Sequence, residues 1–118
     1  MLLVKTDRRT YSYGDTVHFH LRLYNESTES RAYAFSTTQR FDIAVWNHDM
    51  LVWQWNKGRL FSQVAAMLTI QPGDSRVFSA EWDLRDMEGR RLPTGSYQIH
   101  VWMVSNEEKD SISIEVRE

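Results

Sequence analysis

Residues 82–101 read WDLRDMEGRRLPTGSYQIHV, and they carry the strongest indication of the fold. A strand ends near Trp82, the chain then turns through Pro93 and Gly95, and Tyr97 opens the next strand. Glycine supplies a backbone angle that other residues resist. A tyrosine ring can be buried when its hydroxyl finds a partner, such as backbone across the turn. The stretch therefore predicts two strands joined by a loop whose corner is held by Tyr97.

Apolar and polar residues alternate through much of the remaining chain. The clearest case is Thr16 to Tyr24, where every second residue from Val17 to Leu23 is apolar. This period of two is typical of a strand with one buried face. Further strands are predicted near residues 2–6, 32–36, 41–45, 51–55, 78–82, 97–103 and 112–116. About eight or nine antiparallel strands, punctuated by turns and closed by a Gly-x-Tyr corner, predict an all-β, immunoglobulin-like Greek-key β-sandwich.

Leu60 to Leu68 is the stretch that departs from this alternation. Phe61, Val64 and Leu68 recur there at the spacing of a helix face. We interpret it as a long, partly ordered connection between the sheets, and leave open whether it is strand, helix or loop.

Length and composition narrow the class of protein. The 118 residues predict a single domain over residues 1–118, and 42% of them are hydrophobic, enough for a core. The absence of cysteine excludes a disulfide framework and a thiolate metal site, and favours a reducing compartment. No signal peptide and no apolar span is apparent, so we expect a cytoplasmic protein that does not bind a membrane. A removed leader would leave the same sequence.

Charge and motifs favour a binding protein over an enzyme. The 14 basic residues are balanced by 16 acidic ones, and no basic stripe interleaved with aromatics indicates a nucleic-acid partner. The chain lacks a Gly-x-Ser-x-Gly elbow, a phosphate loop and a His-Glu-x-x-His motif. We therefore predict no catalytic residues and no cofactor, while the oligomeric state stays open.

The histidines are considered as metal ligands. His18 and His20 share one face of a strand, and His100 could add a third ligand if its strand lay next to theirs. No cysteine or neighbouring carboxylate completes the set, and solvated histidines are ordinary on the polar side of a strand. We therefore predict no metal site.

Trp53 and Trp55 form a candidate aromatic face, because residues two apart on a strand point the same way. Such a face, if exposed, could bind a sugar ring or a protein partner. The competing interpretation is that both rings fill the core or cover a sheet edge, as large aromatics often do.

The stretch Asn56 to Ser62 is a candidate proteinase-contact loop. It combines Lys57 and Arg59 with Leu60 and Phe61 around a flexible glycine. A protease-binding loop must be extended, accessible and able to offer one anchoring side chain to the substrate cleft. Leu60 or Phe61 could be that anchor. The competing interpretation is an ordinary crossing loop whose two apolar side chains pack into the core.

Several segments together form a family pattern: FSTTQRFDI (35–43), WQW (53–55), FSQ (61–63), LTI (68–70), PGD (72–74), Trp82 and LPTGSY (92–97). They resemble the BsuPI family of bacterial intracellular inhibitors of a subtilisin-type serine proteinase, over about residues 24–104. The resemblance implies an immunoglobulin-like sandwich, a cytoplasmic setting and a proteinase partner.

The same pattern includes Ser36, Gln39 and Gln63 as well as the Gly95–Tyr97 corner. We interpret these residues as structural, because a side-chain amide can satisfy backbone groups where a chain leaves a sheet. Our leading hypothesis is a non-covalent inhibitor of an intracellular subtilisin-type serine proteinase that blocks the substrate cleft with a surface loop. The alternative is a non-inhibitory module that binds carbohydrate or a protein through the aromatic face.

Overall fold

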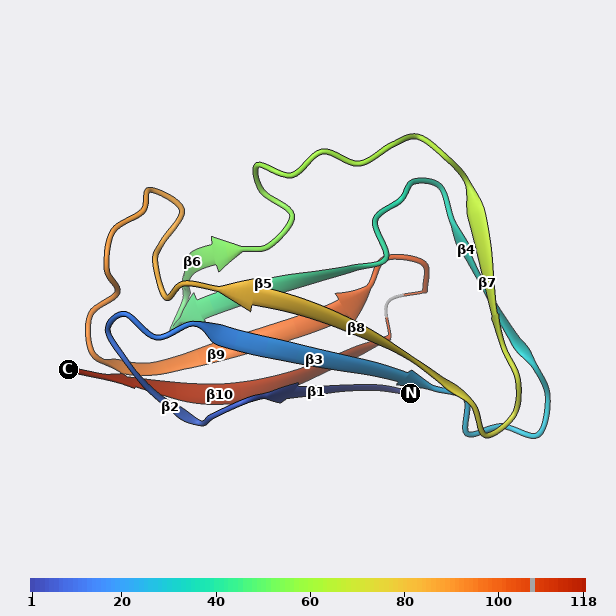
Figure 1. The fold of residues 1–118 in the computed structure, drawn as a ribbon, viewed down its shortest axis with the longest axis horizontal. Coiled ribbons are helices and arrows are strands. Elements are labelled where there is room, and N and C mark those ends of the chain that lie inside the picture. Colours follow the sequence, from blue (N-terminus) through green and yellow to red (C-terminus); the bar gives the residue numbers. More distant parts are fainter. Residues whose placement is uncertain (107) are drawn as a thin grey trace.

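The described part of the chain, residues 1–106 and 108–118, contains ten strands and no helix in a computed structural model (Figure 1). No helix capable of crossing a membrane is found among these residues. The strands are β1 (Leu2–Thr6), β2 (Thr10–Ser12), β3 (Val17–Tyr24), β4 (Arg31–Phe35), β5 (Phe41–Asn47), β6 (Met50–Gln54), β7 (Ala66–Ile70), β8 (Ser75–Trp82), β9 (Gly95–Met103) and β10 (Lys109–Arg117).

Eight of these strands form two layers. One sheet has the order β1-β3-β8, and the other has the order β2-β10-β9-β5-β6. The pairing is antiparallel except between β2 and β10, which run parallel. The predicted immunoglobulin-like sandwich is therefore confirmed, but the expectation of purely antiparallel pairing was wrong. Strand β2 was missed because three residues are too few to reveal an alternation.

The remaining two strands pair with each other. Strands β4 and β7 form a separate two-stranded sheet that projects beyond one end of the two layers (Figure 1). The helix-like spacing of Phe61, Val64 and Leu68 was misleading, because residues 59–65 have no regular structure and residues 66–70 are β7. Strand β7 forms because it pairs with β4, more than thirty residues earlier in the chain, and local sequence does not show such a partner.

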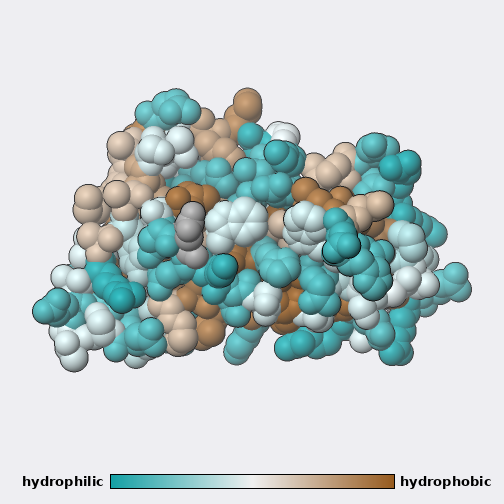
Figure 2. Space-filling view, turned by 180° about the vertical axis from the view of Figure 1, so that it is seen from behind, coloured by the Kyte–Doolittle hydropathy of each residue, from teal (hydrophilic) through white to brown (hydrophobic). Residues whose placement is uncertain are grey.

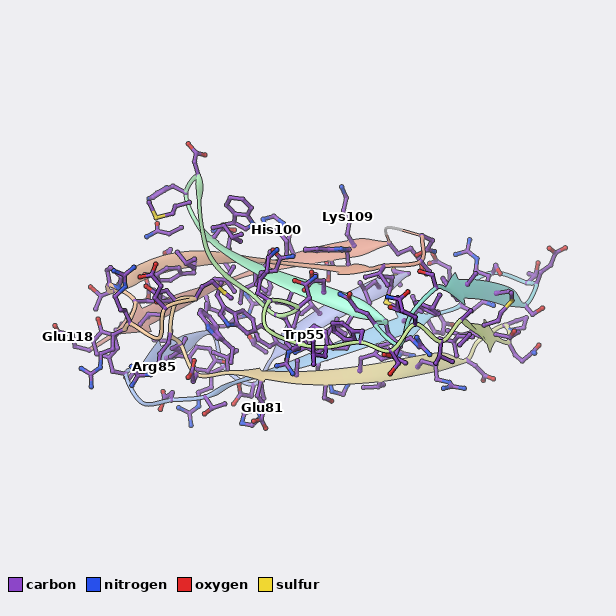
Figure 3. The ribbon with its side chains drawn as sticks, turned by 90° about the horizontal axis from the view of Figure 1, so that it is seen from above. Trp55, Glu81, Arg85, His100, Lys109 and Glu118 are labelled. Carbon is purple, nitrogen blue, oxygen red and sulfur yellow. The ribbon has the colours of Figure 1, made fainter. Side chains whose placement is uncertain are left out.

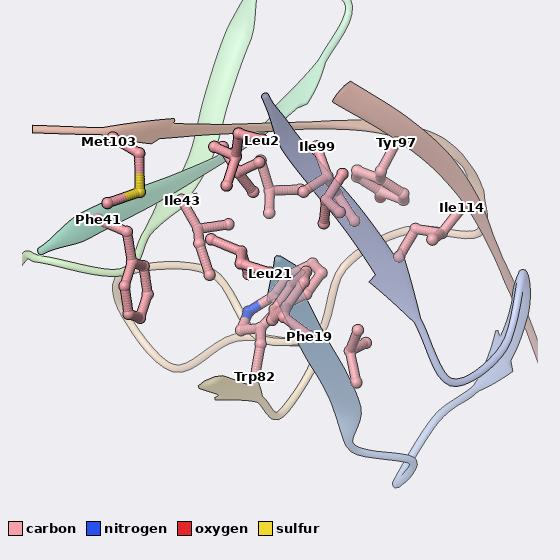
Figure 4. Close-up of a cluster of buried hydrophobic side chains, with 14 of the residues drawn as sticks. Leu2, Phe19, Leu21, Phe41, Ile43, Trp82, Tyr97, Ile99, Met103 and Ile114 are labelled. Carbon is pink, nitrogen blue, oxygen red and sulfur yellow. The ribbon is translucent and has the colours of Figure 1, made fainter. Parts of the chain in front are cut away.

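The core lies between the two layers, and side chains from both sheets meet there (Figure 4). Every second residue of β3 is buried, as its alternation predicts. The fully buried large side chains include Tyr11, Phe19, Leu21, Leu23, Ile43, Leu84, Tyr97, Ile99 and Met103. Burial of this apolar area is the main contribution to the stability of the fold.

The corner before β9 has the geometry that a Gly-x-Tyr motif requires. Gly95 has a φ of 145°, a value that side chains rarely allow. The buried Tyr97 hydroxyl donates a hydrogen bond to the carbonyl of Pro93. Burial of the ring, with a smaller contribution from Tyr13, raises the pKa of Tyr97 above its usual value. The hydroxyl therefore stays neutral and holds the long loop against the sandwich.

Candidate functional site

Residues 55–65, here called the connecting segment, run from β6 to β7 across the upper side of the molecule in Figure 1. Residues 55–58 form a turn in which Gly58 has a φ of 79°. Residues 59–65 then contain no turn, bend or strand. All four predicted contact residues, Lys57, Arg59, Leu60 and Phe61, lie on this segment.

A buried carboxylate holds the start of the connecting segment. Asp42 on β5 is 2% exposed, and its Oδ1 accepts the N–H of Ile43 at 2.8 Å and of Asn56 at 3.1 Å. Its Oδ2 accepts the side-chain amide of Gln54 at 2.7 Å. Because Gln54 and Asn56 lie on either side of Trp55, their bonds to Asp42 set the direction in which the chain leaves β6. Sequence analysis missed this role, since Asp42 sits at a polar position of an alternating run.

Aromatic rings from β6 and β8 pack against each other beside the connecting segment. Trp53 stacks on Trp82 at a centroid distance of 5.3 Å, and on Phe19 at 6.4 Å. Trp55 stacks on Phe41 at 4.4 Å. Both tryptophans are half-buried and pack against the core. Trp53 also lines an open surface hollow with Trp82, Glu81 and Arg59.

Trp55, labelled in Figure 3, also contacts two side chains of the connecting segment. The guanidinium of Arg59 lies over the ring at 4.4 Å from its centroid, and Arg59 Nε donates to the Trp55 carbonyl at 2.8 Å. The ring of Phe61 lies 5.8 Å from the same indole. Between these two residues, Leu60 is 99% exposed. The structure thus separates the two candidate anchors, because Phe61 packs on the protein and Leu60 does not.

Lys57, the remaining predicted contact residue, is exposed on the turn that precedes Gly58. Its backbone N–H donates to the carbonyl of Gln54 at 3.3 Å. A backbone hydrogen bond therefore holds the turn, while the Lys57 side chain faces solvent.

The far end of the connecting segment is tied to the turn between β4 and β5. The Thr38 N–H donates to the Ser62 carbonyl at 3.0 Å, and the Ser62 N–H donates to Thr38 Oγ1 at 3.0 Å. In the same turn, the Gln39 side chain donates to the Phe41 carbonyl at 3.0 Å, as expected for an amide where a chain joins a sheet. Sequence analysis did not identify Thr38, although it stands inside the quoted FSTTQRFDI run.

Two other residues of the family pattern have a different placement. Ser36 is exposed at the end of β4. Gln63 is exposed as well, and in the described part of the chain it makes no side-chain hydrogen bond. The role predicted for Gln63, in which its side-chain amide binds backbone groups, is therefore not seen among the described residues.

The histidines do not converge. His18 and His20 lie on the outer side of β3, whose neighbours are β1 and β8. His100 lies on β9 in the other sheet, and Figure 3 shows it on the opposite side of the molecule from Glu81, whose Oε1 lies 3.3 Å from His18 Nδ1. The condition for a third histidine ligand is therefore not met. Residues 1–106 and 108–118 hold no group of three metal-ligating side chains.

The outer face of the five-stranded sheet carries a hollow whose lining includes His100, Trp102 and Lys109. Hydrophilic side chains dominate this face, and apolar ones form small separate areas (Figure 2). Scattered apolar side chains of this kind are ordinary on a protein surface.

Comparison with protein families shows to which family the chain belongs. The pattern of the BsuPI family, described as an intracellular proteinase inhibitor, matches residues 4–108. The chain belongs to the BsuPI family. The family is described as a family of proteinase inhibitors, not of enzymes. The match extends beyond residues 24–104, and it contains both Asp42 and the whole connecting segment.

Solved structures show the fold of this BsuPI-family chain and nothing more, because their sequences are too distant. An alkylpurine DNA glycosylase, AlkC from Pseudomonas fluorescens, bound to DNA, has a TM-score of 0.57 at 14% identity, covering 99% of this chain and 30% of that one. A CARDB domain from Pyrococcus furiosus, in complex with di-metal ions, has a TM-score of 0.52 at 10% identity, covering 98% and 85%.

A β-glucosidase from Listeria innocua in complex with laminaribiose has a TM-score of 0.53 at 12% identity. It covers all of this chain, which spans 16% of the length of the glucosidase. No curated protein matches the chain in sequence. The proteinase-inhibitor assignment therefore rests on the family, and the sandwich is a scaffold shared with proteins of other functions.

Proposed function

We propose that this protein is a reversible, non-covalent inhibitor of an intracellular subtilisin-type serine proteinase in the cytoplasm. In this proposal the connecting segment occupies the substrate cleft. The observation that supports it is Leu60, which is 99% exposed on a segment held at both ends. The subtilisin-type target rests on the family resemblance.

An exposed leucine at a fixed position is well suited to binding. Transfer of a leucine side chain from water into an apolar pocket contributes about 1.5–3 kcal/mol. Because Asp42 and Thr38 already restrain the segment, little conformational freedom remains to be lost in the complex. Proteinase–inhibitor contacts of this kind bury about 800 Å² on each partner.

Titration of a bacterial intracellular subtilisin with the purified protein tests the proposal. We expect a stoichiometric loss of peptidase activity while the added protein stays intact on a gel. Unchanged peptidase activity, or steady digestion of the added protein, would contradict the proposal.

A pair of double variants tests the contribution of the segment. The L60A/F61A variant should lose most of its affinity for the proteinase, because both candidate anchors are removed. The M67A/V77A variant is the matched control, since Met67 on β7 is 66% exposed and Val77 on β8 is 50% exposed, and both lie outside the connecting segment. Equal inhibition by the two double variants would place the contact surface elsewhere on the molecule.

A further inference from the structure

We infer that Leu60, and not Phe61, enters the specificity pocket of the proteinase, and that Trp55 holds the residues on both sides of Leu60 so that the segment is not degraded. The partner is then a serine proteinase whose specificity pocket accepts a leucine-sized aliphatic side chain. This inference rests on the proposed inhibitory function.

The first argument is the direction of three successive side chains. Arg59 and Phe61 both turn toward the indole of Trp55, whereas Leu60 between them is 99% exposed. Alternation of this kind is typical of an extended backbone. An extended chain can add to the cleft of a proteinase as a substrate strand and insert one side chain into a pocket. Leu60 can enter such a pocket without any rearrangement, while Phe61 would first have to leave Trp55.

The second argument is how firmly the neighbours of Leu60 are held. Trp55 stacks on Phe41 of β5, and its N–H donates to the Ile43 carbonyl at 2.8 Å. Arg59 is bound to Trp55 through its ring and its carbonyl. Ser62, one residue beyond Phe61, exchanges two hydrogen bonds with Thr38. Chain on each side of the Leu60–Phe61 bond is therefore attached independently to the sandwich.

This attachment has a chemical consequence. If the serine hydroxyl of the proteinase attacks the Leu60 carbonyl, an ester forms and the Phe61 amine is released. Hydrolysis then requires that amine to move away so that water can attack the ester. Because Phe61 and Ser62 stay bound to Trp55 and Thr38, the amine remains close and can attack the ester instead. The peptide bond re-forms and the proton returns to the serine, so the segment stays intact.

Single variants test the anchor, assayed against the same intracellular subtilisin. L60A should weaken inhibition by about 30-fold or more, the loss typical of a central anchoring residue. V77A is the matched control, because Val77 is 50% exposed on β8 outside the connecting segment, and it should inhibit like the unaltered protein. L60R should shift inhibition toward a trypsin-like proteinase. If the unaltered protein inhibits and L60A inhibits equally well, the inference is wrong while the proposed function stands. No inhibition by the unaltered protein overturns both.

Two further variants test the clamp. F61A and R59A should still bind initially, but they should be cut between residues 60 and 61 faster than the unaltered protein, by about tenfold or more. Mass spectrometry locates the cut, and urea unfolding measures whether each variant remains folded. A stably folded F61A variant that resists cutting as well as the unaltered protein would overturn the clamp. Faster cutting confined to bonds other than Leu60–Phe61 would also overturn the clamp.

Discussion

The connection between β8 and β9, residues 83–94, and the connecting segment, residues 55–65, are similar in length but treat their leucines in opposite ways. Leu84 and Leu92 are each 2% exposed, whereas Leu60 is 99% exposed. Exposure of an isolated apolar side chain is common. Nearly complete exposure on a restrained segment is more informative, because the restraint keeps the leucine out of the core.

The two connections also differ in how they are held. Residues 83–94 are largely tied to themselves, since the Asp86 carboxylate accepts the N–H groups of Glu88 and Arg90 at 2.9 Å. The connecting segment has a contact of Arg59 with Trp55 inside it, but both of its ends are bound to other parts of the molecule, by Asp42 at its start and Thr38 at its far end. A loop that satisfies its own polar groups and buries its leucines stabilises the fold. In the connecting segment, by contrast, the exposed leucine lies between residues that are bound to the sandwich, as the proposed contact requires.

The largest expected difference between the two connections is in stability. Leu92→Ala should lower the free energy of unfolding by about 2–5 kcal/mol, because it leaves a cavity in the core. Leu60→Ala should change it by no more than about 0.5 kcal/mol, since Leu60 contacts little. Urea unfolding of the two variants measures this contrast. A large loss of stability in the L60A variant would show that Leu60 is structural.

A smaller effect is expected at the base of the connecting segment. Asp42→Ala leaves the N–H of Asn56 and the amide of Gln54 without an acceptor, which should lower stability by about 1–3 kcal/mol. Because the segment then loses its direction, inhibition should weaken more than in the L92A variant, although that variant is less stable. If the two variants inhibit equally at a temperature where both are folded, Asp42 does not position the segment.

The smallest effect is a pH dependence confined to residues 83–94. Hydrogen bonds from the N–H groups of Arg90 and Glu88 hold the pKa of Asp86 below its ordinary value of 3.8. The folded state therefore binds this proton more weakly than the unfolded state does. Its contribution to stability is full above pH 3.8 and is lost as the pH falls through the lower, folded value.

Thermal unfolding between pH 2 and pH 6 checks this expectation with the D86N variant. The melting temperature of the unaltered protein should fall more steeply with acid than that of D86N. Parallel curves would show that Asp86 does not contribute. L60A serves as the control from the connecting segment, and it should keep the acid dependence of the unaltered protein.

The sandwich could be predicted from the sequence where strands are long and alternate regularly. Strand β3 was expected at residues 16–24 and is found at Val17–Tyr24, and β1 was expected with its observed bounds. Strand β2 was missed and the conformation of the stretch that leads into β7 was left open, because each strand depends on a partner distant in the chain, β10 and β4 respectively. Short strands gain their stability from such pairing and not from their own residues.

The candidate site, like the fold, could be predicted from the sequence only in part. The exposed apolar and basic residues at Lys57 to Phe61 could be recognised from their composition beside a flexible glycine. Their support could not, because a buried acceptor at Asp42 and a partner at Thr38 look like ordinary polar positions in a strand and a turn. Nothing in the local pattern distinguishes Phe61, which packs on Trp55, from Leu60, which does not.

The amino-acid sequence by itself determined the layered β architecture, the Tyr97 corner and the family to which the chain belongs. These features depend on short-range chemistry, namely alternation, turn residues and a motif close together in the chain. Only the tertiary structure decided which leucine is exposed and what holds the segment around it. Asp42 on β5 binds Asn56, and Thr38 in the turn between β4 and β5 binds Ser62, and contacts between such distant parts of the chain exist only once the chain has folded.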